Sequence, residues 1–182
     1  RELSEARHIA GQRYMRAMQL LNEGEERNIV AKGHYNFTQN QVLEYTTFTD
    51  AVYQFKTPLT YDAAFEGMLR LSYLASDFQT LQSKLGRQYV MESYRRGESH
   101  IAVNYRRILN DAEPMWIQLV MQAFINPATA ELEGFSYAYD ITEAVLKESI
   151  VAHMGSLGYD ELGLIYTGSR FWRCYQYMER QR

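Results

Sequence analysis

The chain has 182 residues, of which 46% are hydrophobic, so it is long enough for one domain or slightly more with a sizeable core. Its net charge of −3 gives no overall basic field, which argues against nucleic acid or anionic lipid as a partner. No apolar run approaches the ~18 residues of a membrane-spanning helix, and residues 1–15 lack the layout of a signal peptide. We therefore expect a cytoplasmic segment without membrane contact. Because it opens without an initiator Met, we expect a piece of a longer protein, whose other parts could include a membrane span.

A helix and a hairpin are predicted first. Residues 2–23 carry a partial apolar stripe at helical spacing, and Gly24 ends it. Residues 28–36 and 41–48 are typical of two strands joined by a tight turn at residues 37–40. The helix needs a partner, because an isolated helix of this length is marginally stable in water.

Three helices are predicted next, over residues 61–75, 77–85 and 87–96. Asp62 lies in the first turn of the first helix, where the helix dipole favours a negative charge. Gly97 ends the third helix.

Three strands in a meander follow, from Ile101 to Leu109, from 115 to 126 and from 132 to 139. Apolar and polar residues alternate along the first two, as in strands with one buried face. A final helix is predicted over residues 141–154, with Asp140 as its N-cap and Glu143 completing a capping box. The last strand therefore leads directly into a helix.

Residues 155–182 do not fit inside this unit. Residues 161–166 and 170–177 predict a second hairpin, whose layout repeats that of residues 29–48. It is either the start of a second domain of the same kind or a C-terminal hairpin of the first domain. Its apolar side chains need cover in both cases, so this end should pack on something or promote self-association.

The meander carries a family resemblance. It reads Tyr105-Arg106-Arg107, a short turn, Trp116 in a long strand, a turn at Pro127 to Glu131, Gly134-Phe135, and Asp140-Ile141-Thr142-Glu143. This pattern resembles the C-terminal half of a PAS sensory domain. Asp140-Ile141-Thr142 looks like the signature at which PAS domains of multidomain bacterial signalling proteins join an effector, often a diguanylate cyclase. The segment from His34 to Asn40 is similar to the first strand and turn of such domains, and the resemblance covers residues 28–145.

The resemblance implies an α+β fold. The expected architecture is a PAS-like five-stranded antiparallel sheet with helices crossing one face, plus an N-terminal helix and a C-terminal linker helix. Wrapping of the sheet should place strand 29–36 beside both 41–48 and 132–139. The expected organisation is an N-terminal helix at 1–24, the PAS-like domain at 25–140, an output helix at 141–154 and the hairpin segment at 155–182.

The resemblance also bears on cofactors. A haem-binding PAS domain usually takes its axial His from the helical middle, and residues 49–99 contain no His. A flavin photoreceptor of this type needs a reactive Cys there, and the single Cys174 lies outside that region. The four His residues are far apart and show no metal-ligand spacing. We therefore expect neither haem, flavin nor metal, and a small-molecule ligand of unknown identity instead.

Candidate ligand-binding residues come from the strands. Arg106 and Arg107 point to opposite faces, so one of them must face the core, where a guanidinium requires a carboxylate partner or an anionic ligand. The many aromatic residues indicate either cross-strand packing or a small pocket between sheet and helices. Glu131 and Glu133 are expected to be solvated. The ligand-binding candidates are Tyr105, Arg107, Trp116, Gln118, Gln122 and Tyr137.

The function expected from these features is a sensory or regulatory module. A small ligand or partner would favour one sheet geometry, and Asp140, Thr142 and Glu143 would relay the change through the following helix. We expect no catalysis by this chain, a homodimer, and an effector domain such as a diguanylate cyclase in the same polypeptide. The alternatives are a small α+β enzyme with its site in the same cavity, or a dimerisation domain without a ligand.

Overall fold

A computed structural model describes residues 11–12, 28–48, 59–108, 113–157, 161–167 and 170–176. The chain divides into two compact units, residues 1–141 and 142–182. Of the helix predicted over residues 2–23, Gly11 and Gln12 are described, and both are helical. The rest of that prediction lies outside the described residues.

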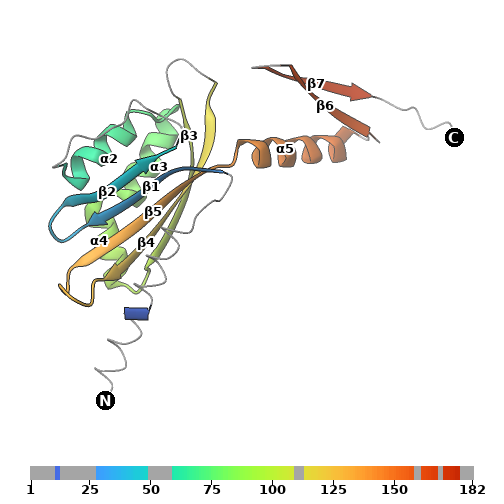
Figure 1. Cartoon of the computed structure of the whole chain (residues 1–182). Helices are drawn as coiled ribbons and strands as arrows, with labels where there is room; N and C mark the ends of the chain where they lie inside the picture. The colour runs from blue at the N-terminus through green and yellow to red at the C-terminus, as the bar shows by residue number, and fades with distance from the viewer. Residues whose placement is uncertain are drawn as a thin grey trace. The chain divides into compact units, whose positions relative to one another are not determined.

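The first unit contains a five-stranded sheet (Figure 1). Its strands are β1 (Ile29–Asn36), β2 (Gln41–Thr47), β3 (His100–Arg107), β4 (Met115–Ile125) and β5 (Leu132–Asp140). Their order in the sheet is β2-β1-β5-β4-β3, and every neighbouring pair is antiparallel. The first strand therefore lies between the second and the last. This confirms the architecture that the PAS resemblance implies.

Three helices lie on the same side of this sheet: α2 (Tyr61–Leu69), α3 (Ala75–Leu85) and α4 (Arg87–Arg95) (Figure 1). Helix α2 begins where the hydroxyl of Thr60 accepts a hydrogen bond from the backbone N–H of Ala63 at 3.2 Å. The carboxylate of Asp77 accepts from the N–H of Leu74 at the start of α3. After α4 the chain turns at Gly97, whose φ of +89° suits glycine.

The predicted helix over 61–75 is too long, because it ends at Leu69. The backbone that follows pairs with the edge of β3. Tyr73 donates to the carbonyl of Arg106 at 2.9 Å, and Ile108 donates to the carbonyl of Leu71 at 3.0 Å. These bonds pair backbone groups that follow the helix, and they cover part of an open sheet edge.

The core lies between the sheet and these helices. Aromatic rings from both layers meet at one end of it: Tyr61 packs edge-on against Tyr35 and Phe37, with centroids 5.1 and 4.9 Å apart. Leu81, Leu85 and Ile117 are fully buried in the same core. Gly134 makes this packing possible, because a Cβ at that position would lie 2.5 Å from the Phe37 ring.

The second unit contains a helix and a hairpin. The helix is α5 (Thr142–Leu157), and the hairpin pairs β6 (Glu161–Thr167) with β7 (Arg170–Gln176) in antiparallel register. The sequence placed the helix at 141–154 and the hairpin at 161–177, close to these bounds. That the hairpin starts a second PAS-like domain stays a prediction. Among the described residues, no helix is long and apolar enough to cross a membrane.

Candidate ligand cavity

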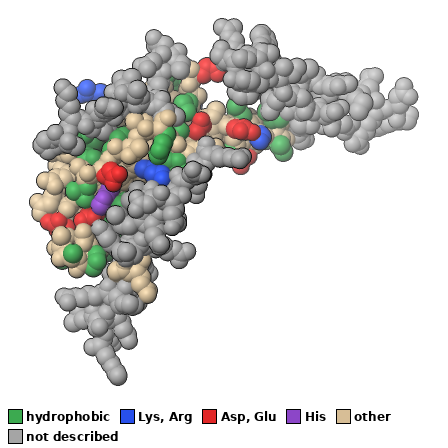
Figure 2. Space-filling view, viewed as in Figure 1, with side chains coloured by type: hydrophobic (Ala, Val, Ile, Leu, Met, Phe, Trp, Pro, Cys, Tyr) green, Lys and Arg blue, Asp and Glu red, His purple; other side chains and the backbone are tan. Residues whose placement is uncertain are grey.

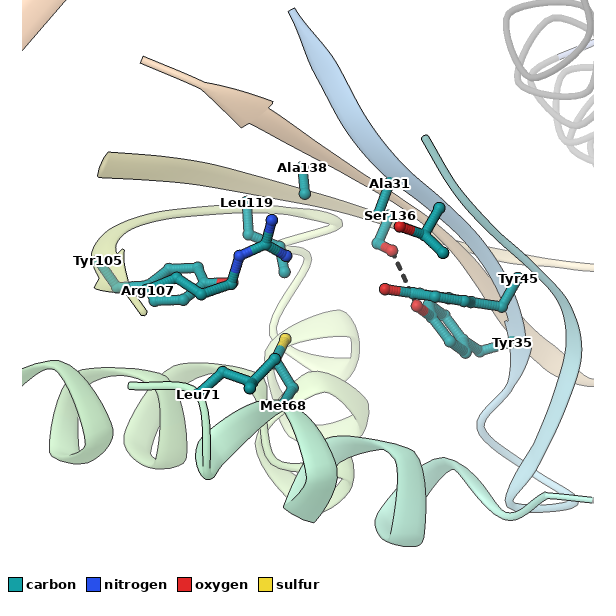
Figure 3. Close-up of a pocket in the computed structure, with 11 residues that line it drawn as sticks. Ala31, Tyr35, Tyr45, Met68, Leu71, Tyr105, Arg107, Leu119, Ser136 and Ala138 are labelled. Carbon is teal, nitrogen blue, oxygen red and sulfur yellow. Dashed lines mark hydrogen bonds between the residues drawn. The ribbon is translucent and has the colours of Figure 1, made fainter. Parts of the chain in front are cut away.

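A cavity of about 40 Å³ lies between the helix-facing side of the sheet and helix α2 (Figure 3). All five strands and the end of α2 contribute to it. The lining residues are Ala31, Tyr35, Tyr45, Thr47, Met68, Leu71, Tyr105, Arg107, Leu119, Ser136 and Ala138. A second cavity of about 50 Å³ shares Tyr35, Tyr45, Met68, Leu119 and Ser136 with it, so the two adjoin.

Small residues on the two central strands make room for this cavity. Ala31 of β1 lies opposite Ala138 of β5, and Gly33 of β1 lies opposite Ser136. All four belong to the middle of the sheet, where bulky side chains would otherwise fill the space beneath the helices. Strand alternation brings them to the same face, where Ala31, Ser136 and Ala138 line the cavity and the Tyr35 ring packs over Gly33.

Tyr35 depends on Gly33 for its position. The phenol folds back over Gly33, and a Cβ at that position would collide with the Tyr35 ring. The Tyr35 hydroxyl thereby reaches Ser136 and forms a hydrogen bond of 3.0 Å with its Oγ (Figure 3). Burial raises the pKa of Tyr35 well above its ordinary value, so the phenol remains a neutral hydrogen-bonding group.

Arg107 brings positive charge to the cavity. Its side chain is 5% exposed, and Figure 3 shows the guanidinium and the Tyr35 and Tyr45 hydroxyls pointing toward one another across the cavity. Burial raises the pKa of Tyr105 to about 12, while the charge of Arg107 acts in the opposite direction. Among the described lining residues of both cavities there is no Asp, Glu, His or Cys. The raised pKa values of Tyr35 and Tyr105 therefore keep these two phenols neutral around neutral pH.

The structure decides which of the two consecutive arginines faces the core. Arg106 donates to the carboxylate of Asp77 at 3.2 Å, and its guanidinium lies over the Trp116 ring, 5.0 Å from the centroid. Arg107 lines the cavity instead. The prediction was that one of the two arginines faces the core side, and Arg107 is the one that lines the cavity. That Arg107 binds a ligand stays a prediction.

Of the six ligand-binding candidates, Tyr105 and Arg107 line the cavity, and the other four do not. Trp116, Gln118 and Gln122 alternate with the buried residues of β4, and Tyr137 alternates with Ser136 and Ala138, so all four lie on the opposite face of the sheet. Gln118 donates to Asn104 at 3.2 Å, and Tyr137 stacks on Tyr139. None of these four residues lines either cavity, and a role of theirs in ligand binding stays a prediction.

Tyr35, Tyr45 and Ser136 line the cavity but were not among the residues predicted from the sequence. The available signal was a run of small residues, Ala31, Gly33, Ser136 and Ala138, at alternate positions of two strands that the fold makes neighbours.

The expected relay residues lie where β5 ends. Asp140 is the last residue of β5, and Thr142 is the first of α5. The backbone N–H of Asp140 donates to the carbonyl of Asn28, and that of Ile141 donates to the carbonyl of Trp116, at 2.8 and 2.9 Å. The end of β5 is thus fixed to both neighbouring strands. Whether Asp140 caps α5 stays a prediction.

The opposite face of the sheet carries a polar cluster near the turns (Figure 2). His34 Nε2 lies 2.7 Å from Glu133 Oε2, and the other oxygen of Glu133 accepts from Asn126 at 2.7 Å. Glu133 is 4% exposed, so the expectation of a solvated side chain is wrong for it. The strand that contains Glu133 was predicted correctly, but its pairing with β1, which brings Glu133 beside His34, could not be seen in the local sequence.

The strand order, with three helices over one face of the sheet, defines a PAS-like α+β fold that encloses a cavity. No protein-family model and no curated protein matches the sequence. Two similar solved structures are the N-terminal domain of a diguanylate cyclase with PAS/PAC sensor from Marinobacter aquaeolei and an RNA-binding Light-Oxygen-Voltage receptor. The first has a TM-score of 0.44 and 11% identity, covering 63% of this chain and 96% of the other. The second has a TM-score of 0.38 and 17% identity, covering 71% of this chain and 34% of the other.

Proposed function

We propose that this chain is a sensory module that binds a small molecule in the cavity and transmits its occupancy through β5 to α5. The main observation behind this proposal is that a single strand, β5, runs from the cavity to the start of the helix. Ser136 and Ala138 line the cavity, and Asp140, two residues further along β5, directly precedes the junction with the helix. A ligand that changes the position of Ser136 or Ala138 therefore acts on a strand that ends at the junction.

The cavity chemistry supports binding. Arginine and buried phenols can orient a ligand by charge and hydrogen bonds. Burial raises the pKa of Tyr35 and of Tyr105, so these two phenols stay neutral around neutral pH. Acid–base catalysis would call for a group whose pKa lies near the working pH. The lining therefore suits a receptor better than an enzyme.

The output is the second part of the proposal. The resemblance of Asp140-Ile141-Thr142 to a PAS–effector junction supports an effector domain in the same polypeptide, such as a diguanylate cyclase. We further propose that the module works in the cytoplasm as a homodimer. In such a dimer, paired α5 helices would pass the ligand-dependent change to a dimeric effector.

Native mass spectrometry of the freshly purified 182-residue chain tests the ligand site. We expect a retained small molecule in the unaltered protein, and its loss in Ala138→Val, because the two added methyl groups enter the cavity. Ala102→Val is the matched control, since Ala102 is an exposed residue on the other face of β3. Retention of the same adduct by Ala138→Val, or equal loss in both variants, would contradict the proposal.

A further inference from the structure

We infer that the two adjoining cavities bind a small uncharged organic molecule. Its apolar part lies in the second cavity, and its one acceptor oxygen receives a hydrogen bond from the hydroxyl pair of Tyr35 and Ser136. This ligand class rests on the ligand-binding function proposed above and names what the site selects. Three features support it: the lining of the second cavity, the hydroxyl pair that both cavities share, and the size of the cavities.

The second cavity is lined mainly by apolar side chains. Phe65 and Met68 come from α2, and Leu119 and Met121 come from β4. Methionine side chains are flexible and polarisable, so they adapt to apolar groups of different shape. None of the described residues that line this cavity is an Asp, Glu, Lys, Arg or His. A charged group placed here would lose its water without gaining an opposite charge from the lining, so the lining selects an uncharged group.

Tyr61 adds an aromatic ring to this lining, and its hydroxyl proton is already used. The hydroxyl donates to the backbone carbonyl of Leu85 at 2.6 Å. Burial raises the pKa of Tyr61 well above its ordinary value, so the phenol keeps this proton. Tyr61 therefore offers the ligand a ring surface, and the hydrogen bond to the ligand must come from another residue.

Tyr35 and Ser136 each supply a hydroxyl group to both cavities. The two oxygens lie 3.0 Å apart, and either hydroxyl can be the donor in the hydrogen bond between them (Figure 3). Two hydroxyls carry two protons, and this bond uses one of them. Among the described residues, the side chains of this pair form no second hydrogen bond. Because both residues are buried, an unused hydroxyl proton is costly, and an acceptor oxygen on the ligand would satisfy it.

The size of the cavities sets the length of the ligand. Volumes of about 50 and 40 Å³ each hold about three or four water-sized groups. Met68 and Leu119 line both cavities, so an alkyl chain can pass from one to the other along apolar side chains. A short-chain ketone fits this arrangement, with its carbonyl oxygen at the hydroxyl pair and its alkyl chain in the second cavity.

The test uses methyl propyl ketone as the probe and butyrate as its charged isostere, in which an oxygen replaces the methyl group on the carbonyl carbon. Binding to the 182-residue chain at neutral pH is followed by changes in the amide NMR signals of Phe65, Met121 and Ser136. We expect the ketone to bind. Butyrate should bind at least about tenfold more weakly, because its carboxylate must leave water for an uncharged lining.

Variants assign the binding to the two parts of the site. Ala64→Leu extends a side chain into the second cavity and should abolish ketone binding, whereas Ala63→Leu, at an exposed position of the same helix, should leave it unchanged. If Ala64→Leu does not fold, the smaller Ala64→Val takes its place. The double variant Tyr35→Phe/Ser136→Ala removes both hydroxyls and should weaken ketone binding by about threefold to tenfold, as the loss of one neutral hydrogen bond does. Xenon, which binds in apolar cavities without hydrogen bonds, should bind this double variant as it binds the unaltered protein.

The outcomes distinguish this ligand class from the proposed function. Butyrate binding as tight as that of the ketone would overturn the uncharged class. Equal ketone binding by the double variant and the unaltered protein would overturn the contact with the hydroxyl pair, and ketone binding that persists in Ala64→Leu would overturn the placement in the second cavity. If the ketone causes no signal change, the ligand class fails, and the adduct in the native mass spectrum still decides independently whether the cavity holds a ligand.

Discussion

At the scale of single residues, Gly33 determines where the Tyr35 phenol lies. A Gly33→Ala substitution places a methyl group where the ring now packs, and overpacking of this kind typically costs about 1–3 kcal/mol. We expect that loss in the free energy of urea unfolding, together with loss of the Tyr35–Ser136 hydrogen bond.

The same substitution in a Tyr35→Leu background is the control. Because the clash is with the tyrosine ring, Gly33→Ala should cost clearly less there, giving a non-zero coupling energy in a double-mutant cycle. Additive losses would show that the glycine is needed for another reason.

Glu131 gives a prediction about pH. Hydrogen bonds from Gln39 and then Asn36 stabilise its carboxylate and hold its pKa below the ordinary value of 4.5. A pKa that is depressed on folding contributes stability above the unfolded pKa, and this contribution is lost as the pH falls through the folded pKa. We therefore expect the free energy of unfolding to fall more between about pH 5 and about pH 3 in the unaltered protein than in Glu131→Gln. Parallel pH profiles of the unaltered protein and Glu131→Gln would show that Glu131 does not contribute stability in this way.

At the scale of elements, the junction between β5 and α5 is the feature to test. If Asp140 caps the helix, Asp140→Ala should cost about 0.5–2 kcal/mol, measured by chemical unfolding. It should also change regulation of an attached effector in the full-length protein. Glu148→Ala is the control, because Glu148 is exposed further along the same helix. Lower stability with unchanged regulation would leave Asp140 as a helix cap without a relay role.

The elements themselves could be predicted from the sequence, and the cavity could be predicted only in part. Alternation and the prolines at 114 and 127 place β4 closely, because a strand with one buried face repeats every two residues. The same alternation permits a site on either face, and the side chains of Gln118 and Gln122 lie on the face away from the helices. The end of α2 could not be predicted either, since its pairing with β3 joins residues far apart in the sequence.

The contribution of the small residues to the cavity was the second feature that could not be predicted from the sequence. Ala31 and Ala138 are unremarkable along the chain and form one side of the cavity only when β1 lies beside β5. Arg107 could be chosen as a candidate site residue from the sequence. Burying a charge has a high energetic cost, so an arginine on a strand face that points to the core calls for a partner or a ligand.

At the scale of the whole molecule, we expect the chain to associate with itself. The predicted N-terminal helix, the helix after Asp140 and the trailing hairpin present apolar residues that a single unit of this size cannot all cover, and two-fold dimers are the commonest arrangement that buries such surfaces. Sedimentation velocity at micromolar concentration should show a dimer. A monomer across that range would contradict this expectation.

The pairing of residues 71–73 with β3 has a consequence for sequence variation among related chains. Ser72 forms a β-bridge with Arg107, so this short connection fixes the backbone that carries the cavity's guanidinium. A change in the length of the connection between α2 and α3 would therefore move Arg107 and alter the site, although the connection is outside the sheet. The turn at residues 127–130 contributes no residue to the cavity, and insertions there should be tolerated without a change in ligand preference.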